Sequence, residues 1–226
     1  MNPSHNLRER KPDLSPFLFH FTSGEDPFGN INSIIDEQRL VCNSSAEDYL
    51  KAVCFTESPL TLSQQVFNYM NSWSKPRFSK YGIAFKRDVL IRDYLARPVI
   101  YGDEHEYKLL PYELKWRFEL LDVNQHDFQW LREWRIKGEI FNFSNISTDD
   151  IIIITPTTEG LGKIVAFQEF DELDFEFDHG ETFPYPIYKL SREWKGVSFE
   201  MLSSYSTDRE LERDTDLQKI GETIQM

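Results

Sequence analysis

The sequence FLFHFT at residues 17–22 is a short apolar run that contains two polar side chains. An apolar run of this length is typical of a buried strand. Because successive side chains point to opposite faces of a strand, we expect His20 and Thr22 on one face and Phe19 and Phe21 on the other. An imidazole beside a hydroxyl offers paired hydrogen-bond donors and acceptors. The strand therefore predicts a polar face suited to a ribose or a phosphate.

A second apolar run, AVCFTESPL at residues 52–60, predicts a strand that ends at Ser58 and Pro59. Between the two runs, apolar residues at helical spacing from Ile31 to Leu40 predict a short amphipathic helix. Another helix is expected over residues 62–70, where Ser58 or Thr61 is available to cap its N-terminus. Two strand–helix units are therefore expected to open the domain.

The next elements are read from the same two periodicities. Residues 106–126 are expected to be helical, and the alternation after residue 132 favours a strand over 130–136. Residues 151–155, four isoleucines and a threonine, form the clearest buried strand. The other expected elements are strands at 81–85 and 99–102 and a helix over 88–94.

Composition divides the chain into four stretches. We expect a flexible lead-in at 1–15, an α+β core domain at 16–160, and an acidic, Phe-rich extension of the core at 161–202. Residues 203–226 are expected to be a polar tail or a short helix. Within the extension, seven acidic side chains lie in residues 169–181, interleaved with phenylalanines.

Length and charge limit the possible functions. With 226 residues, 40% hydrophobic and 15% aromatic, the chain can form a substantial core. A net charge of −13 argues against non-specific binding to nucleic acid. The two cysteines form no disulfide framework or metal-binding spacing, which favours a reducing compartment. Without a membrane-spanning run or a signal peptide, the chain is expected to be cytoplasmic, with no membrane partner.

Two other kinds of site are weaker matches. The HFT sequence fits the motif of two-histidine phosphoesterases, but the other histidines supply no second copy. The acidic stretch around His105 at residues 103–106 lacks a defined metal-ligand spacing, so a solvated loop is favoured and no metal is expected. The chain has no phosphate-binding loop and no nucleophile elbow.

Three positions occur in an order known from one fold: His20 on the first strand, Phe55 on the second, and Glu133 late in the core. In this order the chain resembles the ADP-ribosyltransferase fold, whose members bind NAD in a cleft. The resemblance implies an α+β fold with two small, mainly antiparallel sheets around that cleft and short helices. The chain departs from those transferases because Phe55 replaces a tyrosine and no Ser-Thr-Ser run is present.

Four short motifs, HFT, CFTESPL, YGIAF and ARPVIY, resemble the AbiGi-type abortive phage-resistance proteins of bacteria. This resemblance covers about residues 16–155. Members of that group are described as antitoxins. The resemblance therefore implies a component of antiviral defence or of a toxin–antitoxin system.

NAD is the cofactor that the resemblance implies. Cleavage of its nicotinamide–ribose bond produces a cation-like ribose, which the Glu133 carboxylate can stabilise. His20 can bind the adenosine ribose, an aromatic ring can stack on nicotinamide, and an arginine can bind the pyrophosphate. The predicted catalytic residues are Glu133 and His20. The predicted cofactor-binding residues are His20, Phe21, Thr22, Phe55, Tyr81, Arg97 and Arg135.

Each of these residues has a structural alternative. His20 can be a partly buried side chain with a protein partner, and Phe55 can belong to the core. Glu133 and Arg135 share one strand face, where they can form an ion pair. Glu57 can support a helix N-terminus. Convergence of His20 and Glu133 on one open cleft favours an enzyme, whereas an ion-paired Glu133 in a cleft filled by aromatic rings argues against it.

A second functional hypothesis is a non-catalytic antitoxin. Its acidic residues 169–181 would cover a basic surface on a protein partner, with the phenylalanines as anchors. The protein partner in either hypothesis is a cognate toxin or a modification target.

Overall fold

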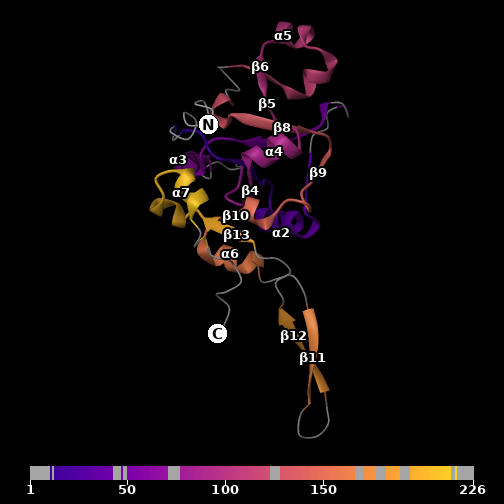
Figure 1. Ribbon diagram of the computed structural model, residues 1–226, viewed down its shortest axis with the longest axis vertical. Helices are drawn as coiled ribbons and strands as arrows, with labels where there is room; N and C mark the ends of the chain where they lie inside the picture. Colours follow the sequence, from indigo (N-terminus) through magenta and orange to yellow (C-terminus); the bar gives the residue numbers. More distant parts are fainter. Residues whose placement is uncertain are drawn as a thin grey trace.

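The computed structural model describes residues 11, 13–42, 47, 50–70, 77–122, 128–165, 170–176, 182–188, 194–214 and 217 (Figure 1). Helices and several sheets occur along the chain, so the expected mixture of α and β structure is confirmed. Within the described part, no helix has the length and apolar character needed to cross a membrane.

The largest sheet has seven strands in the order β13-β10-β4-β1-β3-β8-β5. All neighbouring pairs are antiparallel except β10 and β13, which are parallel. The strands are β1 (Phe17–Phe21), β3 (Ala52–Thr56), β4 (Gly82–Lys86), β5 (Arg97–Pro98), β8 (Glu133–Lys137), β10 (Ile151–Thr155) and β13 (Lys195–Ser198).

Three two-stranded sheets accompany the large sheet. They pair β2 (Arg39–Val41) with β9 (Ile140–Asn142), β6 (Ile100–Gly102) with β7 (Phe118–Leu120), and β11 (Phe170–Glu176) with β12 (Thr182–Tyr188). The described strands thus form one large sheet rather than two small ones of similar size, because β1 joins β4 and β3 into a single sheet.

Six α-helices and four short 3-10 helices are described. The α-helices are α2 (Pro27–Glu37), α3 (Leu60–Met70), α4 (Arg87–Asp93), α5 (Glu104–Leu109), α6 (Thr158–Val165) and α7 (Asp208–Arg213). The 3-10 helices are η2 (Tyr112–Arg117), η3 (Gln129–Leu131), η4 (Thr148–Asp150) and η5 (Met201–Ser204).

Alternate residues of β10 pack into two different cores. Ile151 and Ile153 join a cluster with side chains of α2, α4 and α6, whereas Ile152 and Ile154 join a cluster with α3 and α7 (Figure 1). Because both faces of the sheet are covered, all five residues of β10 are buried. The uninterrupted isoleucine run is therefore explained by a strand with no solvent-exposed face.

The prediction of a helix over residues 106–126 is wrong for most of that range. Helix α5 ends at Leu109, and η2 and β7 follow it. Pro111 explains the break, because a proline disfavours helical geometry at the preceding residue, and Leu110 is extended with φ −65° and ψ 134°. Residues 123–127 lie outside the described residues.

Neither Ser58 nor Thr61 caps α3 as expected. The Ser58 hydroxyl donates to the carbonyl of Trp130 instead. The Asp208 carboxylate accepts hydrogen bonds from the amides of Leu60 and Thr61, both at 2.9 Å. A residue distant in sequence therefore fills the capping role.

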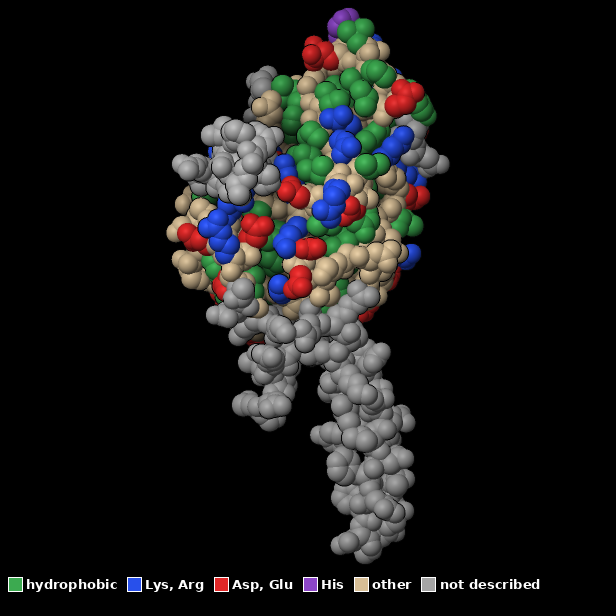
Figure 2. All heavy atoms as spheres, viewed as in Figure 1, with side chains coloured by type: hydrophobic (Ala, Val, Ile, Leu, Met, Phe, Trp, Pro, Cys, Tyr) green, Lys and Arg blue, Asp and Glu red, His purple; other side chains and the backbone are tan. Residues whose placement is uncertain are grey.

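The two ends of the chain are described in part. Residues 1–10 and 12 of the expected lead-in lie outside the described residues, as do 215–216 and 218–226 of the expected tail. Within 203–214, helix α7 buries Leu211 completely. Figure 2 shows basic and acidic side chains interspersed on one face, so the charge of −13 forms no continuous acidic patch there.

Candidate functional site

The candidate site lies where β1 and β3 separate. β1 pairs with β4 from Phe17 to Phe21, but its register with β3 is Phe19 opposite Thr56. Beyond that pair, Nδ1 of the His20 imidazole lies 2.9 Å from the Cys54 carbonyl oxygen. The side chain of His20 therefore spans the gap between the two strands at the point where a pocket opens.

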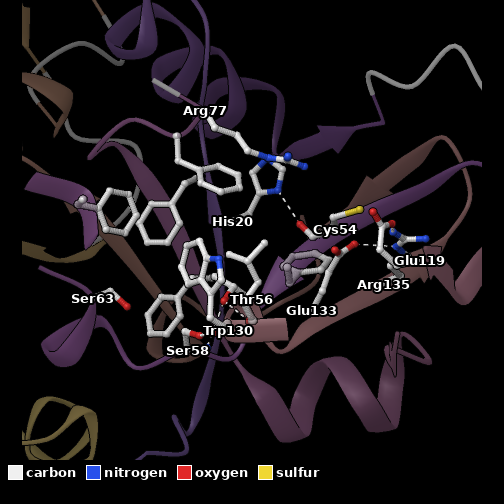
Figure 3. Close-up of a pocket in the computed structure, with 16 residues that line it drawn as sticks. His20, Cys54, Thr56, Ser58, Ser63, Arg77, Glu119, Trp130, Glu133 and Arg135 are labelled. Atoms are coloured by element: carbon white, nitrogen blue, oxygen red, sulfur yellow. Dashed lines mark hydrogen bonds and ion pairs between the residues drawn. The ribbon is translucent and has the colours of Figure 1, made fainter. Parts of the chain in front are cut away.

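This pocket has a volume of about 200 Å³ and two chemically different ends (Figure 3). One end is polar and the other is aromatic. The polar end holds His20, Cys54, Glu119, Glu133 and Arg135. The aromatic rings that line the pocket are Phe19, Phe21, Phe55, Phe67, Phe78 and Trp130.

The bond to Cys54 fixes the tautomer of the His20 imidazole. A carbonyl oxygen only accepts hydrogen bonds, so Nδ1 carries the proton and Nε2 of the neutral ring is an acceptor. Burial lowers the pKa of His20 from its ordinary value, and the bond to Cys54 opposes this in part. His20 is therefore a neutral hydrogen-bond acceptor near pH 7, suited to a hydroxyl group of a ligand.

Glu133 is held by Arg135. The Arg135 Nε donates to Oε1 of Glu133 at 2.7 Å. Its remaining groups donate to the carboxylate of Glu119 and to the carbonyls of Trp116 and Phe118, at 3.1 and 2.8 Å for the two carbonyls. Burial alone would lower the pKa of Arg135, but the adjacent Glu133 keeps this pKa above its ordinary value. The guanidinium thus ties residues 116–119 to the sheet and fixes Glu133.

Five of the predicted site residues line this one pocket. They are His20, Phe21, Phe55, Glu133 and Arg135. Three of the structural alternatives also hold, because His20 is partly buried with a protein partner, Phe55 is in the core and Glu133 forms an ion pair with Arg135. His20 and Glu133 therefore meet in one pocket, which favours an enzyme. The same Glu133 is ion-paired in a pocket lined by aromatic rings, which argues against an enzyme.

The other three predicted residues do not line the pocket. Thr22 is buried and its Oγ1 bonds to Ser79 Oγ at 2.7 Å, because β1 ends at Phe21 and the strand alternation stops there. The Tyr81 ring packs against Phe28, with centroids 5.8 Å apart. Arg97 Nη1 donates to the carbonyl of Ala96 at 2.8 Å.

The other lining residues were not predicted as site residues, and among them are Cys54, Arg77, Glu119 and Trp130. Cys54 could have been found, because it precedes the predicted site residue Phe55 in the same predicted strand. Burial, with the adjacent Glu133 carboxylate, raises the pKa of Cys54 to about 12, so its thiol is not a thiolate at neutral pH. Arg77 has no signal in the sequence that marks it as a site residue.

Arg77 is exposed beside the pocket, on the side where Figure 3 places His20. Its guanidinium lies 4.0 Å from the centre of the Phe128 ring. Among the described residues, no carboxylate forms an ion pair with Arg77. This arginine is therefore available to an anionic group of a ligand.

The described residues contain no group of three or more His, Cys, Asp and Glu side chains that could hold a metal ion. The acidic residues near His105 have a structural role instead. Asp103 and Glu106 form a reciprocal capping box at the start of α5, with both bonds at 2.8 Å. Glu57 pairs with Arg87 at 3.2 Å and accepts from the Trp134 indole at 3.0 Å, outside the pocket.

No family model, curated protein or solved structure matches this chain. The function is therefore inferred from the pocket itself.

Proposed function

We propose that this chain is an ADP-ribosyltransferase-like protein that binds NAD or a related nucleotide in the pocket between β1 and β3. The observation that carries the proposal is that His20 and Glu133, from distant parts of the sequence, line one pocket. The resemblance to AbiGi-type proteins supports a role for this activity in a bacterial defence or toxin–antitoxin system, and we propose that the protein acts in the cytoplasm.

In the proposed complex, the aromatic end of the pocket holds the nicotinamide ring and the polar end holds the attached ribose. The Nε2 atom of His20 accepts a hydrogen bond from a ribose hydroxyl. The bond between the ribose carbon and the nicotinamide nitrogen breaks, and its electron pair leaves with neutral nicotinamide. The Glu133 carboxylate stabilises the positive charge that develops on the ribose until a nucleophile adds to the same carbon and loses its proton.

Arginines have two separate roles in this proposal. Arg135 is a positioning residue, because its hydrogen bonds to Glu133, Glu119 and two carbonyls occupy the guanidinium. Arg77 is the better partner for the pyrophosphate, because it is exposed at the pocket and has no ion-pair partner within the described chain. A pocket of about 200 Å³ is small for a ligand site, so it suits the nicotinamide riboside portion rather than the whole dinucleotide.

A non-catalytic interaction protein is the second candidate. The ion pair between Glu133 and Arg135, the small pocket and the net charge of −13 favour it. The acidic stretch at 169–181 would supply its surface, of which β11 is described and residues 169 and 177–181 are not.

The two candidates are distinguished by incubating the purified protein with NAD and measuring nicotinamide release. We expect Glu133→Gln to reduce the rate by at least about a hundredfold, because it removes a charge that acts in the transition state. The matched control is Glu57→Gln, which neutralises another arginine-paired carboxylate outside the pocket and should keep the wild-type rate while folded. Thermal melting checks that both variants are folded.

Equal rates for Glu133→Gln and wild type would remove Glu133 from the mechanism. Binding of NAD by calorimetry without nicotinamide release would indicate a nucleotide sensor. Neither binding nor release would leave the interaction protein as the better candidate.

A further inference from the structure

A second pocket of about 280 Å³ adjoins the first along the same face of β3 and β8. Ala52 and Cys54 of β3 line it, and the segment from Tyr107 to Glu119 covers it. The two pockets share three lining residues, Cys54, Glu119 and Arg135. The ion pairs of Arg135 with Glu119 and Glu133, at one side of the first pocket in Figure 3, therefore form the wall between the two pockets.

Aromatic rings make up much of the second pocket. Tyr107 and Phe118 have ring centres 5.0 Å apart and planes inclined by 50°. The indole N–H of Trp116 donates to the Glu113 carbonyl at 2.8 Å, so this ring offers its apolar surface to the pocket rather than a donor. Surfaces of this kind bind planar rings by stacking.

Lys115 adds a positive charge to these rings. Its Nζ lies 4.5 Å from the centre of the Tyr107 ring. Within the described part of the chain, Lys115 has no carboxylate partner, whereas Arg135 on the shared wall is paired with Glu119 and Glu133. The pocket therefore combines ring surfaces with one cation that forms no ion pair among the described residues.

We propose that the second pocket binds a nucleoside phosphate, with the base against Tyr107, Trp116 and Phe118 and the phosphate on Lys115. A lysine ammonium is a common partner of phosphate groups. The ligand can be a free nucleotide or the AMP half of an NAD molecule whose nicotinamide end lies in the first pocket. Only this last source depends on the proposed function.

The probes are AMP and adenosine, titrated by calorimetry into wild type, Lys115→Met and Lys108→Met. Methionine is an unbranched side chain of similar size without the charge, and Lys108 is an exposed lysine of α5 outside this pocket. We expect Lys115→Met to weaken AMP binding by at least about tenfold, while Lys108→Met binds AMP as wild type does. Adenosine, which lacks the phosphate, should bind all three proteins alike.

Failure of AMP to bind wild type would overturn the proposal, and so would equal AMP affinity for Lys115→Met and wild type when melting shows both are folded. Repeating the titration with NAD present identifies the source of the nucleotide. Displacement of AMP by NAD, with weaker NAD binding to Lys115→Met, indicates the AMP half of NAD. AMP binding to NAD-loaded protein indicates a free nucleotide. Lys115-dependent AMP binding without any NAD binding would retain this site and refute the proposed function.

Discussion

At the scale of the residue, His20 connects the fold to the site. The β1–β3 register is Phe19 opposite Thr56, and the imidazole of His20 bonds to the Cys54 carbonyl beyond that pair. The same bond turns Nε2 into an acceptor. One side chain thus links β1 to β3 and supplies a hydrogen-bond acceptor to the pocket.

Burial at this position predicts a pH dependence of stability. Because burial lowers the pKa of His20 from 6.5, the unfolded chain binds more protons at this residue than the folded protein just below that pH. The free energy of unfolding should therefore decrease as the pH falls from about 6.5 to the folded-state pKa, and the contribution should be constant below it.

The variant His20→Gln tests this effect, because glutamine has no group that titrates in this range and is a polar side chain of similar size. We expect the Tm of wild type to fall more than that of His20→Gln between about pH 7 and pH 5, measured by circular dichroism. An equal change in Tm with pH for wild type and His20→Gln would show that His20 has the same pKa in the folded and unfolded states.

At the scale of the element, α3 depends on a cap supplied from outside it. The Asp208 carboxylate accepts from Ser15 Oγ at 2.7 Å and from Leu60 N, Thr61 N and Thr61 Oγ1, each at 2.9 Å. Asp208 itself is 2% exposed. The first turn of α3, the start of β1 and helix α7 therefore meet at one buried carboxylate.

Removal of this carboxylate should be costly. We expect Asp208→Ala to lower the free energy of unfolding by about 2–4 kcal/mol, because it leaves the α3 amides buried without acceptors. Asp208→Asn keeps one oxygen and should have an intermediate effect. Urea denaturation measures the change, with Glu212→Ala, an exposed position of the same helix, expected to change it by less than about 0.5 kcal/mol. Similar values for Asp208→Ala and Glu212→Ala would refute the capping role.

The elements were predictable where their signals are local. Short apolar runs predicted β3 and β10, because this signal needs no knowledge of the partner strand. The cap of α3 was not predictable, since Asp208 lies 148 residues from Leu60 in the sequence. Distant partners of this kind leave no trace in a single sequence.

The sequence also predicted part of the site. The order of His20, Phe55 and Glu133 identified three residues that line one pocket. The ion pair of Arg135 with Glu133 was one of the alternatives that the sequence offered, but its bonds to the carbonyls of Trp116 and Phe118 were hidden, because that segment was expected to be helical. A helix would have used those carbonyls internally, so the error in secondary structure concealed the partners of Arg135.

At the scale of the whole molecule, the C-terminal segment supports the aromatic end of the pocket. Phe19 and Phe67 line the pocket and also belong to the second core cluster. In that cluster they pack with residues that follow β13, among them Leu202 and Leu211. The Phe67 and Phe199 rings have centres 5.1 Å apart. The shape of the site therefore depends on residues distant from it in sequence.

Truncation tests this dependence. A chain ending at Ser198 lacks four fully or nearly fully buried side chains, Phe199, Leu202, Leu211 and Leu217, together with the Asp208 cap. Because loss of each large buried side chain costs about 2–5 kcal/mol, the total exceeds the stability of a typical domain. We expect this chain to lose cooperative unfolding and the binding of any pocket ligand, measured by calorimetric melting and titration.

A chain ending at Leu217 retains all of these contacts and should melt as wild type does. Cooperative melting of the shorter chain at the wild-type Tm would show that the first core, between the sheet and α2, α4 and α6, is sufficient for folding.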